Sequence, residues 1–340
     1  MKRRYINPVV GFAATTISIW LLFRSVPLDE MARAMRAPNY WWLVPNLLFG
    51  FLAMWLQAAR WRTLVSPLKN TPMLDIFSAT TIGLMFNNVL PFRLGEYARV
   101  FVLSRQDKDL SQAPLLATVL VERLVFDLGF LVAVVLGVFL FVPFYRELEL
   151  AGSAVPIALL LLIPLIIIVL TATRPRAVSK AVSALLRLVP VRRRTSAQQS
   201  MDSFADMILR IRKRKVIAKA ITLTILTWIS MALSIYFLFV SFSFHLPFTA
   251  AFVLLAAVVL ALFVPSLPGS IGTFHLAAVL ALSTYQIAGA DTRAFSIVLH
   301  LSQYIPTTVI GLIFLHRVNL SLTQIRESVV AGEQQSPRNG

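Results

Sequence analysis

Residues 87–99 combine a helix break with charged and amide side chains, and this combination is the strongest indication of chemistry in the sequence. They read Asn-Asn-Val-Leu-Pro-Phe-Arg-Leu-Gly-Glu-Tyr-Ala-Arg and begin near the end of an apolar run over 74–90. Proline ends a helix and glycine permits a turn, while the arginine side chain offers a planar fork suited to phosphate or carboxylate. The candidate site residues in this stretch are Asn87, Asn88, Arg93, Glu96 and Arg99.

Two interpretations of these charges stay open. In the functional one, Arg93 and Arg99 bind the phosphate of a lipid head group. In the structural one, Arg93, Glu96 and Arg99 pair with one another or extend to the membrane interface. We favour the functional interpretation, because pairing alone does not account for the neighbouring asparagines and the helix break.

A second set of charges lies inside the apolar run over 113–141, at Glu122, Arg123 and Asp127. Arg123 and Asp127 are four residues apart, so they share a helical face and can neutralise each other. Glu122 is then left over, and Arg93 or Arg99 is its expected partner. This network either clamps the two helical segments together, or makes Glu122 or Asp127 a carboxylate for proton coupling or switching.

A second helix break follows the apolar run over 250–264. Its glycines allow close backbone approach, and the N-terminus of a broken helix favours an anion. His275 lies one helical turn further on and either titrates near neutral pH or forms a plain helix contact. On the last apolar run, His300, Gln303 and Tyr304 share one face and are expected to line the bundle interior. The candidate site residues at this break are Pro268, Gly269, Gly272 and His275.

The composition places all these residues in a membrane. Of 340 residues, 58% are hydrophobic and only 14% are charged, with a mean hydropathy of +0.77, whereas soluble chains are about a quarter charged. The net charge of +17 fits positive cytoplasmic loops and anionic lipids, and we expect no nucleic-acid partner. The absence of cysteine excludes disulfides and thiolate catalysis. No catalytic motif occurs, so we expect no enzyme activity, metal or cofactor.

The apolar runs predict an all-α polytopic membrane protein with about six full spans. Two broken or re-entrant helical hairpins are expected in addition, over 74–105 and 250–288. The predicted domain is a single membrane domain over 1–318, with a cytoplasmic basic loop over 173–215, and a polar tail follows over 319–340. The expected full spans are 9–23 (uncleaved), 40–58, 113–141, 155–171, 216–240 and 294–315.

The distribution of basic residues predicts that the first break turns back into the cytoplasm. The span over 40–58 opens with aromatic residues and closes at Arg60-Trp61-Arg62, which the positive-inside rule places in the cytoplasm together with the loop over 173–215. Two clear spans lie between these regions, so a full crossing by 74–90 would make the count wrong by one. A re-entrant hairpin at Pro91 resolves this, provided that it is buried in protein or lines a wet cavity.

The two breaks resemble each other. Leu90–Gly95 and Leu267–Gly272 share the pattern Leu-Pro-x-x-aliphatic-Gly, and the predicted topology enters them from opposite faces. This is typical of a transporter built from an inverted repeat. The frequency of proline and glycine in membrane helices accounts for each break separately, so the repeat and chance both stay open.

Together, three motifs resemble the flippase-like family of lysylphosphatidylglycerol synthase membrane regions. These motifs are Asn88-x-x-Pro-x-Arg-x-Gly-Glu-x-x-Arg99, Glu122-Arg123-x-x-x-Asp127 and Pro268-Gly269-x-x-Gly272, and the resemblance covers roughly 74–315. It implies a bacterial or archaeal membrane protein that moves or handles lipids. The soluble aminoacyl-transfer domain of the synthases is expected to be missing. We therefore do not expect this chain to synthesise lysyl-lipid. Ser270 and His275 depart from the Gly and Glu of the family.

The leading hypothesis is translocation of an anionic phospholipid or a polyprenyl-linked lipid across the plasma membrane, with both termini in the cytoplasm. Arg93, Arg99 and Arg123 would bind the head group, the carboxylates would exchange ion pairs, and the two breaks would form the site. A lipid-binding scaffold or accessory subunit of an envelope-synthesis complex is the alternative. An intramembrane lipid-transfer enzyme is a third.

Overall fold

A computed structural model describes residues 27–89, 94–141, 213–262, 268–287 and 289–321. It also describes the isolated positions 16, 17, 20, 166, 170, 174, 177, 206, 207, 209–211 and 324. The predicted spans over 9–23 and 155–171 therefore fall almost entirely outside the described residues. The same holds for most of the basic loop over 173–215 and of the tail over 319–340, and Pro91 and Arg93 are also outside.

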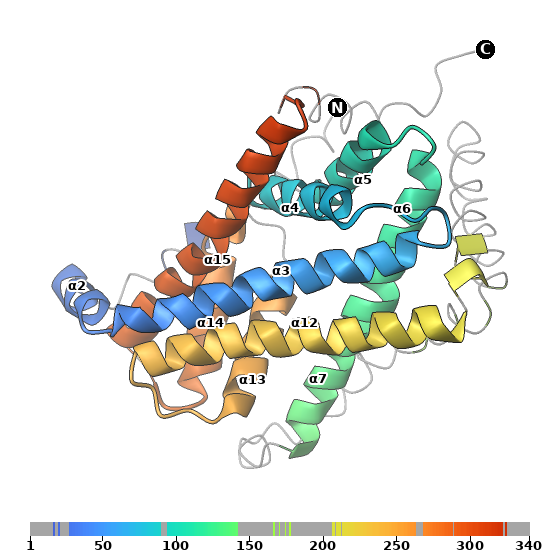
Figure 1. Cartoon of the computed structure of the whole chain (residues 1–340). Helices are drawn as coiled ribbons and strands as arrows, with labels where there is room; N and C mark the ends of the chain where they lie inside the picture. The colour runs from blue at the N-terminus through green and yellow to red at the C-terminus, as the bar shows by residue number, and fades with distance from the viewer. Residues whose placement is uncertain are drawn as a thin grey trace, which may run out of the picture. The chain divides into compact units, whose positions relative to one another are not determined.

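The described residues form helices and no strands (Figure 1). The all-α prediction is confirmed for this part of the chain. The elements are α2 Leu28–Arg36, the 3-10 turn η1 Tyr40–Trp42, α3 Leu43–Val65, α4 Met73–Val89, α5 Gly95–Gln106, α6 Gln112–Val121, the π-helix η3 Glu122–Asp127, α7 Leu128–Phe141, α12 Arg214–Ser241, α13 Phe248–Ala261, the 3-10 turn η6 Pro268–Ser270, α14 Thr273–Ser283 and α15 Ala290–Arg317.

Three helical stretches are long and apolar enough to cross a membrane, namely Tyr40–Val65, Arg214–Ser241 and Ala290–Arg317. They coincide with three of the predicted spans, while the total number of spans stays a prediction. The first of them corrects the sequence analysis, because its helix continues past residue 58 to Val65. Arg60 is consequently an interior helical residue rather than an interfacial one, and it is 1% exposed.

The chain divides into two compact units. Unit 1 contains Met1–Met54, Gly83–Gly95 and Thr227–Ile313, and unit 2 contains the remaining residues. The helices α3, α4, α5, α12 and α15 contribute residues to both units.

In unit 1 the second break separates two short helices that pack against each other, α13 and α14. At 14 and 11 residues, they are about 21 and 17 Å long, shorter than the roughly 30 Å hydrocarbon core of a bilayer. Between them the backbone takes positive φ values at Gly269 (75°) and Gly272 (95°), which glycine adopts without steric cost. The predicted interruption at these glycines is confirmed.

The first break also turns the chain back on itself. In unit 1 the Gly95 N–H donates to Asn87 Oδ1 at 2.9 Å, and in unit 2 Gln106 Nε2 donates to Ser78 Oγ at 2.9 Å. Both contacts bring α5 back onto α4. Asn87 thus satisfies a backbone group that the break leaves open. That this hairpin is re-entrant in the membrane stays a prediction.

Unit 2 has an apolar core to which α3, α6, the π-helix and α12 all contribute. An ion-pair contact joins the loop between α3 and α4 to the loop between α5 and α6. Lys69 Nζ lies 2.8 Å from the Asp107 carboxylate and 2.7 Å from that of Asp109. The core cluster consists of Leu64, Ala117, Val121, Phe126, Met207, Ile211 and Ala220.

We expect Lys69→Met to lower the melting temperature by less than about 3 °C, since exposed ion pairs contribute little. The Lys69 hydrogen bond lowers the pKa of Asp107 below its usual 3.8. The contribution of Asp107 to the stability of the fold is therefore present above pH 3.8 and is lost as the pH falls through the lowered pKa. The carboxylate hydrogen bonds raise the pKa of Lys69 above 10.5, so its contribution is lost only above that value. The effect should be constant between about pH 5 and 9. Thermal unfolding in detergent at pH 5, 7 and 9 tests this, with the neighbouring Lys108→Met as control, and a loss that varies in this window contradicts it.

Candidate functional site

Three elements of unit 2 bring six charged side chains together. Arg60 comes from α3, two residues come from the first turns of α5, and three come from the π-helix that interrupts the helix over 112–141. Since α5 begins at Gly95, its charged residues Glu96 and Arg99 lie one turn apart on one face. Their signs alternate around a closed ring, which we call the charge ring: Arg60, Glu122, Arg99, Glu96, Arg123 and Asp127.

The buried half of the charge ring is built on Glu122, whose side chain is 0% exposed. Arg60 donates from Nε and from Nη2 to Glu122 Oε1, both at 3.0 Å. Arg99 Nη2 lies 2.8 Å from Glu122 Oε2 and 2.8 Å from Glu96 Oε2. The side chains of Arg60 and Arg99 are only 1% and 3% exposed. Glu122 is thus held between two buried arginines.

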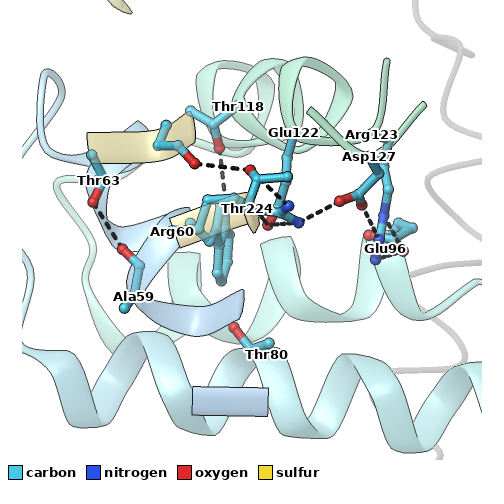
Figure 2. A network of polar contacts seen from close by, with 12 residues as sticks. Ala59, Arg60, Thr63, Thr80, Glu96, Thr118, Glu122, Arg123, Asp127 and Thr224 are labelled. Atoms are coloured by element: carbon cyan, nitrogen blue, oxygen red, sulfur yellow. Dashed lines mark hydrogen bonds and ion pairs between the residues drawn. The ribbon is translucent and has the colours of Figure 1, made fainter. Parts of the chain in front are cut away.

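The other half of the charge ring is more accessible, with side-chain exposures of 19% for Glu96, 28% for Arg123 and 22% for Asp127. Arg123 donates to Glu96 Oε1 from Nη2 at 2.6 Å and to Asp127 Oδ2 from Nη1 at 2.6 Å. Asp127 Oδ1 lies 2.6 Å from Arg60 Nη2, which closes the ring. Figure 2 shows Asp127 bridging Arg60 and Arg123 in this way.

Neutral side chains contact two arginines of the charge ring. Arg60 Nη1 donates to Thr224 Oγ1 at 3.2 Å (Figure 2). The guanidinium of Arg99 lies 4.8 Å from the ring centroid of Trp61, within the range of a cation–π contact. The buried Trp61 in turn donates to Thr118 Oγ1 at 2.9 Å. These contacts fix the orientation of two of the arginines.

The charge ring is electrically balanced, with three arginines against three carboxylates. Each arginine contacts two carboxylates and each carboxylate contacts two arginines, so the formal charges within the ring cancel. Among the described residues, no group of three or more acidic or histidine side chains is placed to hold a metal ion.

A second polar cluster lies in unit 1, where the end of α4 meets α15 and the 3-10 turn η6. Asn88, near the end of α4, donates to Thr308 Oγ1 at 3.1 Å and to the carbonyl of Tyr304 at 3.4 Å. A Cβ atom added to Gly269 would lie 2.9 Å from the Tyr304 ring and 3.6 Å from the Asn88 carbonyl oxygen. The lack of a side chain at Gly269 thus lets η6 lie close to Tyr304 and to the Asn88 carbonyl.

Two histidines extend this cluster. The rings of His275 and His300 are 4.9 Å apart, and His275 Nδ1 lies 3.2 Å from Ser296 Oγ. His275 therefore makes helix contacts, as one of the two interpretations expected. The rings of His300 and Tyr304 meet edge to face, with centroids 5.5 Å apart. Gln303 is exposed, so the expectation that it lines the interior is wrong. Its apolar neighbours in α15, Leu301 and Ile305, are exposed as well, so this part of the helix is not fully enclosed by the protein.

The structure divides the predicted site residues between these two clusters. The pairing of Arg123 with Asp127 is confirmed, as is Arg99 as the partner of Glu122. In unit 1 the structure brings Asn88 and Gly269 together and places Asn87 at the turn, with Gly272 and His275 at the start of α14. Arg93 and the side chain of Pro268 lie outside the described residues. A role for any of these residues in binding stays a prediction.

Neither the burial of Arg60 nor the π-helix was predicted from the sequence. A signal for Arg60 was available, because Trp61, Leu64 and Val65 continue the apolar helical pattern beyond it, and all three are 0% exposed. For the π-helix no local signal exists, since the spacing of Arg123 and Asp127 also fits an α-helix.

Comparison with known families gives one match over most of the chain. The family model described as lysylphosphatidylglycerol synthase TM region matches residues 9–311. Comparison with curated proteins gives no match.

Proposed function

The chain belongs to the family of lysylphosphatidylglycerol synthase transmembrane regions, and from this premise we propose that it moves an anionic lipid between the two leaflets of a bilayer. The substrate class is an anionic phospholipid or a polyprenyl-linked lipid. The setting that fits is the plasma membrane of a bacterium or archaeon, with both termini cytoplasmic. The observation that carries the proposal is the accessible edge of the charge ring.

At that edge one carboxylate bridges two arginines. Asp127 uses Oδ1 for Arg60 and Oδ2 for Arg123, each at 2.6 Å. A phosphodiester carries the same single charge and also offers two free oxygens, which match the planar fork of arginine. A lipid head group can therefore replace Asp127 without changing the charge balance of the ring.

The energetics of buried ion pairs support this use. A buried ion pair contributes little net stability, because desolvation of the two charges offsets their attraction. Apolar side chains of similar volume would join α3, α5 and the π-helix at least as well. A ring of six charges in an apolar chain is thus a costly clamp, whereas a site that exchanges anions needs charged members.

The test is lipid movement in liposomes that contain the purified protein and a fluorescent phosphatidylglycerol, with the outer-leaflet label quenched chemically. We expect Arg123→Gln to slow the movement about 10- to 100-fold, since a charge-assisted hydrogen bond contributes roughly 1.5–3 kcal/mol. Arg123→Lys should keep the charge but lose the fork, and so fall in between. The matched control is Lys108→Gln, which removes one positive charge at an exposed position and should stay within about twofold of the wild type.

Folded Arg123→Gln protein that moves the anionic lipid as fast as the wild type would rule out head-group exchange at this edge. Wild-type protein that moves no lipid alone, but co-purifies with an envelope-synthesis enzyme, would favour the scaffold hypothesis instead.

A further inference from the structure

The π-helix is the element that closes the charge ring. It occupies Glu122–Asp127, and at its end the Leu128 N–H donates to the Arg123 carbonyl, five residues back. In an α-helix this donor would bond four residues back. The π-helix therefore contains one residue more than an α-helical path between α6 and α7 would need.

This extra residue decides which side chains share a face. Glu122 and Asp127 are five residues apart, yet both contact Nη2 of Arg60, at 3.0 and 2.6 Å. With 3.6 residues per turn, two residues five apart in an α-helix point about 140° away from each other. Both carboxylates can reach one guanidinium only because the segment is a π-helix.

A second pair of residues at the same spacing leads to the same conclusion. Val121 and Phe126 are 3% and 7% exposed and belong to one apolar cluster with Leu64 of α3. They too would diverge by about 140° in an α-helix. The π-helix thus matches α7 to α6 on two faces at once, one charged and one apolar.

The alternative α-helical path has a defined consequence. With α6 held in place, Phe126 would take the direction now taken by Asp127, and α7 would turn by about 100°. Arg60 would keep Glu122 but lose Asp127, while Arg123 and Asp127 would remain four residues apart and on one face. The ring would therefore open at a single contact, between Arg60 and Asp127.

We propose that residues 122–127 are a register switch that alternates between the π-helix with a closed charge ring and an α-helix with an open one. The anionic head group is the ligand of the open register, because it fills the place on Arg60 that Asp127 leaves. A ligand that binds one of two states shifts the population toward that state. Lipid binding is then coupled to rotation of α7 relative to α6. The ligand in this proposal rests on the proposed function, whereas the register change does not.

The absence of cysteine from the chain allows a direct test with single spin labels. Leu120→Cys and Ala133→Cys place labels on exposed positions of α6 and α7, on either side of the π-helix. Oxygen accessibility in liposomes is measured with and without Asp127→Asn, which weakens the closed ring. We expect accessibility to change about twofold or more at one label and not at the other. Unchanged values at both labels, or equal changes at both, would overturn the switch.

A deletion separates the switch from the chemistry of the ring. Without Leu124, which is 38% exposed, Glu122 and Asp127 are four residues apart and face Arg60 from a plain α-helix. We expect this variant to remain folded, to show no label change with Asp127→Asn or with phosphatidylglycerol, and to move lipid at least 10-fold more slowly. Leu124→Ala keeps the register and should stay within about twofold of the wild type.

The outcomes distinguish this proposal from the proposed function. A folded deletion variant that moves lipid at the wild-type rate overturns the switch and leaves lipid movement in place. Wild-type protein that moves no lipid, but whose labels still respond to Asp127→Asn, overturns the function and retains the switch. If the deletion variant does not fold, the labels with Asp127→Asn decide alone.

Discussion

Replacing Arg60 by methionine is expected to destabilise the folded protein by about 3–5 kcal/mol. The side chain of Glu122 is 0% exposed, and its Oε1 accepts two hydrogen bonds from Arg60. Without Arg60 the ring carries three negative charges against two positive ones, and one buried carboxylate loses half of its partners. Methionine fills much of the volume, so the loss reports the charge rather than a cavity.

The measurement is thermal unfolding in detergent, followed by fluorescence-detected size exclusion. Arg33→Met is the matched control, because Arg33 also bridges a carboxylate, Asp29, but both side chains are 74% exposed, and such pairs contribute about 0–1 kcal/mol. The double variant Arg60→Met/Glu122→Gln removes one charge of each sign. It should be more stable than Arg60→Met alone, so the losses of stability caused by the two single substitutions should not add. Additive losses would mean that Arg60 does not compensate Glu122.

Pairings within one helix are accessible to sequence reasoning, and so are pairings between neighbouring charged segments. Arg123 and Asp127 are four residues apart, and Arg99 was one of two possible partners for Glu122. Arg60 was assigned to the interface, since hydropathy treats a charge as unfavourable in a membrane whatever its partners are. Its burial depends on two carboxylates more than 60 residues away in the chain. Such compensation is a tertiary property.

The π-helix illustrates a second limit. Local spacing cannot tell a π-helix from an α-helix, because the choice depends on what each face meets. Here Arg60 on one side and Leu64 on the other both require pairs five residues apart. The glycines of the second break were predictable for the opposite reason, since positive φ at Gly269 and Gly272 is a local property.

The sequence predicted a single site in which the charged residues and the ends of the broken helices bind the substrate together. The described residues place the charge ring in unit 2, and the contact of Asn88 with Gly269 in unit 1. The charged residues and the break residues therefore require separate tests, and Gly95 provides the one at the first break.

Gly95→Ala is expected to cost about 3 kcal/mol or more and to abolish lipid movement. An added Cβ would fall on the backbone carbonyl oxygen of Gly83 and lie 2.6 Å from Asn87 Oδ1. Overpacking of this kind costs about 1–3 kcal/mol when side chains can adjust, and more when the backbone must move. Because Glu96 and Arg99 follow directly in α5, any shift of Gly95 also displaces two members of the charge ring.

Gly50→Ala is the matched control, since its nearest neighbour would be Ser234 Oγ at 3.8 Å, an ordinary contact. Its free energy of unfolding should lie within about 1 kcal/mol of that of the wild type. The double variant Gly95→Ala/Asn87→Ala identifies which clash matters. Removing the Asn87 side chain relieves one contact but leaves the Gly83 carbonyl in place, so it should not restore the melting temperature. Rescue by Asn87→Ala would mean that only the side chain opposes Gly95, and a Gly95→Ala protein as stable as Gly50→Ala would contradict the close approach of α5 to α4.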